Sequence, residues 1–152
     1  MPPFPRLRKG RAAALGTIFS ALAAAAPPAL AQGGAPPIRL ELNRLEPREA
    51  GCRVWLVLNN AGAEALDPFR LDLVLFGRDG AVTRRLAVDA GPVPGGRTVV
   101  RLFDVAGQSC EGVGQFLLND VLACNGAEPE ARSACVERTA LASRPEGVPF
   151  LK

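Results

Sequence analysis

The first 31 residues constrain the rest of this chain more than any other feature. An Ala- and Leu-rich run that ends at Ala29-Leu30-Ala31 follows four basic residues, Arg6, Arg8, Lys9 and Arg11. A basic start, a short apolar stretch and a small-residue end are the parts of a secretory signal peptide. The apolar stretch of about 15 residues is shorter than the ~20 that cross a bilayer as a helix. We therefore expect cleavage after Ala31 rather than retention as a membrane anchor.

Cleavage sets both the domain plan and the charge of the product. Residues 1–31 are predicted to be the signal peptide, residues 32–37 a Gly- and Pro-rich flexible spacer, and residues 38–152 one domain. The basic cluster contains no consecutive arginine pair, which favours the general secretory route to the periplasm. Removal of its four basic residues leaves 14 basic against 15 acidic, so the net charge changes from +3 to −1. Such a charge gives no reason to expect nucleic acid or an anionic membrane as a partner.

All four cysteines lie beyond the predicted cleavage site, at Cys52, Cys110, Cys124 and Cys135. An even number of cysteines in an oxidising compartment predicts two disulfides. Spacing alone does not choose among the three pairings that four cysteines allow.

Alternating apolar and polar residues predict strands through most of the domain. The clearest strand is 69–76, and Asp79-Gly80 supplies the tight turn of a hairpin that returns over 81–88. The segment 52–58 is apolar on both faces, as in a central strand. The short apolar run 115–123 fits either a strand or two turns of helix, and we predict a strand. Further strands are expected at 38–43 and 98–103, with a candidate edge strand at 148–151.

Six or seven short strands separated by turn signals predict an all-β fold. The expected architecture is an immunoglobulin-like, two-sheet antiparallel sandwich of about seven strands. In that topology the strands 52–58 and 115–123 run the same way in facing sheets, so Cys52 lies at the same end as Cys110. An extended 114–123 holds Cys110 and Cys124 roughly 30 Å apart, beyond disulfide reach. The strand layout therefore predicts the pairs Cys52–Cys110 and Cys124–Cys135.

Two resemblances agree with this fold. Residues 56–97 resemble the exported immunoglobulin-like modules of bacterial envelope proteins, in Val57-Leu58-Asn59-Asn60, in the strand and hairpin from Leu73 to Gly80, and in Val93-Pro94-Gly95-Gly96. These motifs imply a fold and carry no catalytic residue. Three other stretches resemble uncharacterised secreted (periplasmic) proteins of alphaproteobacteria, a family that implies no known activity: residues 42–47, 84–88 and 117–124.

Composition excludes many chemistries. The chain has no histidine and no tyrosine, and its one methionine is Met1. Catalytic triads with a histidine base, histidine-ligated zinc and Met/His copper sites are therefore excluded. No C-x-x-C pair is present, which argues against a four-cysteine zinc site and against a redox-active pair. We expect no catalytic residue, no metal and no cofactor.

A few polar and aromatic residues are candidates for a site. Asn119 and Asp120 interrupt an apolar run, either as part of a buried hydrogen-bond network or as a binding contact. Trp55, the one tryptophan, is expected to pack in the core rather than to stack on a ligand. Four carboxylates could form a hydrolase pair or a calcium site, although turns and outer strand faces explain each of them: Asp67, Asp72, Asp79 and Asp104.

These observations predict a non-catalytic, exported periplasmic protein that serves as a protein-interaction module of the cell envelope. Another envelope protein would bind a sheet edge or a loop end. One alternative is a small-ligand carrier with an apolar pocket between the sheets. Another is a hydrolase that uses exposed carboxylates.

Overall fold

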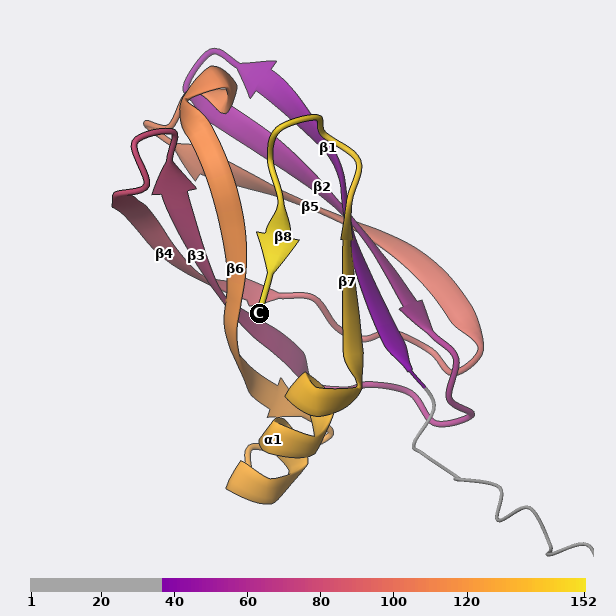
Figure 1. Cartoon of the computed structure of the whole chain (residues 1–152). Helices are drawn as coiled ribbons and strands as arrows, with labels where there is room; N and C mark the ends of the chain where they lie inside the picture. Colours follow the sequence, from indigo (N-terminus) through magenta and orange to yellow (C-terminus); the bar gives the residue numbers. More distant parts are fainter. Residues whose placement is uncertain (1–36) are drawn as a thin grey trace, which may run out of the picture. The chain divides into compact units, whose positions relative to one another are not determined.

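The computed structural model describes residues 37–152 (Figure 1). The predicted signal peptide, its cleavage site and all of the predicted spacer except residue 37 lie outside these residues. The elements are, in chain order, β1 (Ile38–Arg48), β2 (Gly51–Asn60), β3 (Phe69–Gly77), β4 (Val82–Asp89), β5 (Arg97–Ala106), the 3-10 turn η1 (Cys110–Gly112), β6 (Val113–Cys124), α1 (Pro129–Arg138), β7 (Thr139–Ser143) and β8 (Phe150–Leu151).

The strands form two packed sheets of four, with the orders β5-β2-β1-β7 and β4-β3-β6-β8. The expected all-β sandwich is therefore confirmed. The orders β5-β2-β1 and β3-β6 are those of an immunoglobulin-like sandwich. The hairpin β3–β4 turns at Gly80, whose φ of 81° is the left-handed conformation that glycine permits. The segment 115–123 lies within β6, so the choice of strand over helix is also confirmed.

The C-terminal part of the domain departs from the sequence expectation. β7 pairs with β1, and β8 pairs with β6, both in parallel, so the two sheets are not wholly antiparallel. Neither α1 nor β7 was predicted. The candidate edge strand at 148–151 is observed as the two-residue strand β8. No helix within residues 37–152 is long and apolar enough to cross a membrane.

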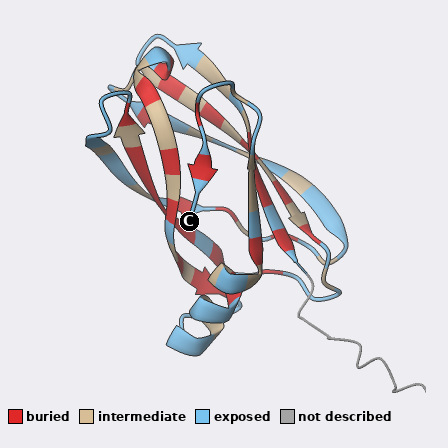
Figure 2. Cartoon of the chain, viewed as in Figure 1, coloured by how far each residue is buried: buried red, intermediate tan, exposed pale blue. Residues whose placement is uncertain are grey.

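The core lies between the sheets and follows the alternation in the sequence. In β2 every second residue from Cys52 to Asn60 is buried, and the intervening residues are half-buried on the outer face (Figure 2). In β3, Phe69 and the leucines at 71, 73 and 75 are at most 1% exposed. Phe116 of β6 packs edge-on against Phe150 of β8, with their ring centroids 6.2 Å apart. Large side chains therefore fill the space between the sheets.

Trp55 is not a core residue, which corrects the sequence interpretation. It lies on the outer face of β2, beside Arg44 and Leu102 in the neighbouring strands. Its indole N–H donates to Glu46 at 3.0 Å, and the Arg44 guanidinium lies 5.3 Å from the ring centroid. Because β2 is apolar on both faces, its sequence did not show which face holds the core.

The disulfides have the predicted pairing. Cys52 is joined to Cys110 with a Cα–Cα distance of 4.9 Å, and Cys124 to Cys135 with a distance of 6.5 Å. The first bond links β2 of one sheet to η1, directly before β6 of the other. The second links the end of β6 to α1.

Candidate functional site

The two polar residues singled out in β6 lie on the outer face of the sheet β4-β3-β6-β8. The pairing of β3 with β6 shifts register there, because Asp72 lies opposite Asp120 while Leu73 lies opposite Leu118. Asn119 is therefore the extra residue of a β-bulge. The bulge explains why a polar pair interrupts the apolar run.

Asn119 completes a hydrogen-bond network around the carboxylate of Asp72. Arg85 of β4 donates to this carboxylate from two nitrogens, at 2.9 and 2.8 Å, and the Asn119 amide donates at 2.6 Å. These donors hold the pKa of Asp72 below its ordinary value, Arg85 contributing most, although burial opposes the shift. Asp72 is 2% exposed, whereas Asn119 is exposed. The network is therefore buried at its centre and open at its rim.

Asp120 belongs to the same rim but has different partners. One carboxylate oxygen accepts from the backbone N–H of Val121 at 2.8 Å. The other lies 3.8 Å from the guanidinium of Arg132 in α1. The carboxylates of Asp72 and Asp120 each face a cation, so the pair lacks the free acid and base that a hydrolase needs.

An apolar surface adjoins this network. Val74 of β3 lies opposite Leu117 of β6, which lies opposite Leu151 of β8, and Phe76 lies opposite Val82 of β4. Directly paired residues share one face of a sheet, so these five side chains form one surface across all four strands, called the outer strip below. Val82 is 62% exposed and Leu151 is 47% exposed.

The outer strip was missed at the sequence level, although part of its signal was present. Val74 and Phe76 break the polar side of the alternation in β3, where a solvated face carries polar residues. The contribution of Leu151 depends on the parallel pairing of β8, which alternation within one segment does not reveal.

The remaining candidate residues are not brought together. The backbone N–H of Asp67 donates to Asn125 at 2.6 Å, and Asp79 accepts from the backbone of Ala81 in the β3–β4 turn at 3.0 Å. Asp104 forms a two-bond ion pair with Arg53 on the other sheet. Residues 37–152 contain no cluster of three or more His, Cys, Asp or Glu side chains that could hold a metal ion.

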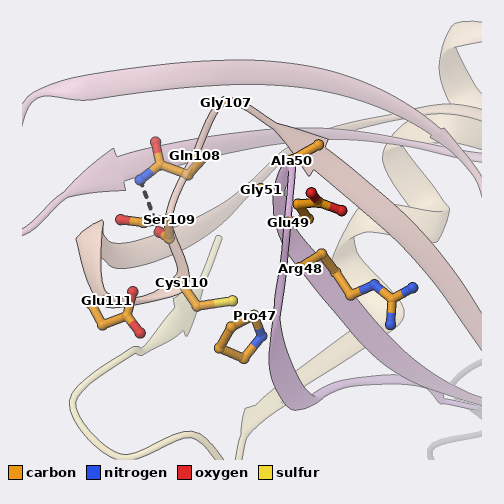
Figure 3. A pocket seen from close by; sticks show the side chains of 10 residues that line it. All are labelled: Pro47, Arg48, Glu49, Ala50, Gly51, Gly107, Gln108, Ser109, Cys110 and Glu111. Atoms are coloured by element: carbon orange, nitrogen blue, oxygen red, sulfur yellow. Dashed lines mark hydrogen bonds between the residues drawn. The ribbon is translucent and has the colours of Figure 1, made fainter.

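Two of the hollows at the ends and sides of the sandwich contain hydrogen-bonded side chains. One, of about 320 Å³, lies between the β1–β2 turn and the loop that leads from β5 to η1 (Figure 3). Its side chains are mixed, with Arg48 and Glu111 on separate segments, and Gln108 donates to the carbonyl of Ser109. The other, of about 420 Å³, lies along β7 and β8. There the Lys152 ammonium donates to three backbone carbonyls, those of Val136, Glu137 and Thr139.

Comparison with known proteins gives no additional assignment. No protein-family model, curated protein or solved structure matches this chain.

Proposed function

We propose that this protein is a non-catalytic, exported periplasmic protein and a protein-interaction module of the cell envelope. Its partner is another envelope protein, which packs an apolar surface against the outer strip. The observation that carries the proposal is the exposure of two apolar side chains on one outer face, Val82 and Leu151, which the half-buried Phe76 and Leu117 adjoin.

The outer strip has the composition of a protein interface. Such interfaces combine an apolar centre with a polar rim, and exposed apolar surface on a soluble domain is a common sign of one. Here Arg85, Asn119 and Asp120 form a polar rim beside the outer strip, and the buried Asp72 binds the first two of them. Because Asp72 and Arg85 already hold one another, this rim presents an ordered set of hydrogen-bonding groups to the partner.

The alternatives have less support. A carrier with a pocket between the sheets conflicts with the large side chains that fill that space, Phe69 and Phe116 among them. A carboxylate hydrolase conflicts with the ion pairs of the two neighbouring carboxylates, since Arg85 faces Asp72 and Arg132 faces Asp120.

Export to the periplasm is supported by the two disulfides, which indicate an oxidising environment outside the cytoplasm. Intact-mass analysis of the protein from a periplasmic extract tests the route. Cleavage after Ala31 gives a chain that begins at Gln32, whereas a full-length species in the membrane fraction would refute export by a cleaved signal peptide.

Site-specific photo-crosslinking in intact cells tests the interaction. A photoreactive amino acid at Val82 and, in a separate strain, at Leu151 should give an adduct with the same partner protein. The control position is Glu146, an exposed residue in the loop before β8. A Leu117→Lys change should abolish both adducts. The same adduct from Glu146, or none from either strip position, would contradict the proposal.

A further inference from the structure

The two sheets end in four edge strands, and three of these edges carry a feature that opposes pairing with another strand. The pairing of β4 with β3 shifts register after Leu75, and β4 carries Arg84 and Arg85 in succession. β7 has only five residues, and the Lys152 ammonium donates a hydrogen bond to the carbonyl of its first residue, Thr139. β8 has two residues. Bulges, charges and shortness are devices that prevent edge-to-edge pairing.

β5 is neither short nor interrupted. It carries three charged residues, Arg97, Arg101 and Asp104, but Arg101 donates to carbonyls of its own chain and Asp104 accepts from Arg53. It has ten residues without proline, and its register with β2 is unbroken along the full length. Within residues 37–152 it pairs with β2 alone, so its other edge presents free backbone donors and acceptors. Val100 and Leu102 are 44% and 46% exposed on the outer face beside this edge.

We propose that β5 pairs antiparallel with β5 of a second copy of this chain, about a two-fold axis at Arg101. In an antiparallel ladder, backbone groups from every second residue point to the same neighbour. Two residues can lie opposite each other only if both point their backbone groups toward the partner strand or both point them away. In a symmetric pair of identical strands, the two-fold axis therefore passes through a residue and not between two residues. Val100, Arg101 and Leu102 are the central candidates.

Of these three axes, only the one at Arg101 keeps both Val100 and Leu102 opposite an apolar side chain. It places Val100 opposite Leu102 of the second copy. An axis at Val100 would instead place Thr98 opposite Leu102, and an axis at Leu102 would place Val100 opposite Asp104. Apolar cross-strand pairs stabilise a sheet, whereas an apolar side chain opposite a carboxylate gains nothing comparable.

The match extends beyond the edge strands. In each copy Trp55 lies beside Leu102, and Val57 lies beside Val100. The dimer therefore continues each apolar row across the junction, from Trp55 and Leu102 of one copy to Val100 and Val57 of the other. The result is one eight-stranded sheet with an apolar band on its outer face.

One pair of polar residues also matches. Thr98 lies opposite Asp104 of the second copy, and its hydroxyl oxygen accepts from Asn59 at 2.9 Å, which leaves its own proton free to donate. The Asp104 carboxylate is half exposed and accepts two bonds from Arg53, so it keeps acceptor capacity. The two Arg101 residues face each other, which is unfavourable for like charges. Each guanidinium is held by carbonyls of Ala90 and Pro92 in its own chain, which draws it away from the other.

Sedimentation velocity of the protein, expressed from its full-length sequence in a host that exports and oxidises proteins, tests the pairing. We expect a monomer–dimer equilibrium, which Val100→Lys weakens by at least about tenfold because it places a charge in the apolar row. The matched control, Val82→Lys, introduces the same charge at an exposed valine of β4 and should leave the equilibrium unchanged. A monomer at all concentrations up to about 100 µM, or equal effects of the two variants, would overturn the proposal.

Disulfide trapping tests the register. A mixture of Val100→Cys and Leu102→Cys proteins should form a covalent heterodimer, whereas each variant alone should form little dimer. Efficient trapping of Val100→Cys alone would place the axis at Val100 and overturn the proposed pairing. The two proposals fail separately, because Val82→Lys should remove the adduct on the outer strip without affecting the dimer, and Val100→Lys should do the reverse.

Discussion

Among single residues, Asp72 shows how a charged side chain is accommodated on a strand that is buried on both faces. β3 lies between β4 and β6, and two of its outward side chains, Asp72 and Val74, are buried. A carboxylate in such a position needs donors that satisfy both oxygens. Arg85 and the bulged Asn119 provide them, so this one buried acid explains features on two other strands.

Replacing Asp72 should therefore destabilise the domain. Asp72→Asn removes the charge that Arg85 binds and should lower the free energy of unfolding by about 1.5–3 kcal/mol, the range for hydrogen bonds to charged groups. Urea denaturation followed by Trp55 fluorescence measures it. The same substitution at Asp79 keeps the turn's acceptor and should change stability by less than about 0.5 kcal/mol. Equal losses at both positions would contradict this account.

Stability should also depend on pH through the acidic residues. Hydrogen bonds from Arg85 and Asn119 lower the pKa of Asp72, and those from Arg144 and Asn43 lower the pKa of Glu41. A carboxylate whose pKa is lower in the folded state stabilises the fold above its unfolded-state pKa, and this contribution is lost as the pH falls through the folded-state pKa. The free energy of unfolding should therefore decrease below about pH 5, with a shallower decrease for Asp72→Asn. An identical pH profile for this variant would argue against the network.

At the level of elements, alternation predicted the strands but not the helix. β3 shows its inward set from Phe69 to Leu75, because the polar residues Arg70 and Asp72 alternate with it in the first half of the strand. α1 has no comparable signal, since Cys135 is its one buried residue. The disulfide to Cys124, an ion pair from Arg132 to Asp120 and the bonds of Lys152 to two helix carbonyls attach the helix to the domain, and sequence periodicity does not detect such attachments. The outer strip was hidden for a related reason, because it joins residues from four separate strands.

Loss of the second disulfide should therefore release α1 with little effect on the sheets. In a Cys124→Ser/Cys135→Ser variant we expect faster amide exchange over residues 129–138 and an unchanged Trp55 emission spectrum. The free energy of unfolding of this variant should be lower by at most about 3 kcal/mol, the value that chain entropy gives for so short a loop. Protected amides in α1 after this change would show that other contacts suffice to hold the helix.

In the molecule as a whole, Cys52–Cys110 ties one sheet to the other across a sequence separation of 58 residues. Its position followed from the antiparallel strand layout of the first six strands. The parallel pairing of β7 and β8 could not be predicted from this layout. Both strands depend on α1, which carries the chain from the end of β6 to the other sheet.

Removing this long-range disulfide should affect the entire domain. A Cys52→Ala/Cys110→Ala variant should lose about 4 kcal/mol of stability, a large part of the total for a domain of this size. Thermal unfolding followed by circular dichroism should show one cooperative transition at a lower temperature for both sheets. The Cys124→Ser/Cys135→Ser protein is the matched control with a smaller shift. A larger shift in the control than in this variant would reverse the assigned roles.

The order of the cysteines has a consequence for how the bonds are made. The first cysteine is joined to the second, and the third to the fourth. A thiol oxidase that meets the chain from its N-terminal side, and joins each new cysteine to the one still free, makes the native set directly. Such a chain needs an oxidant but no isomerase to reshuffle its bonds.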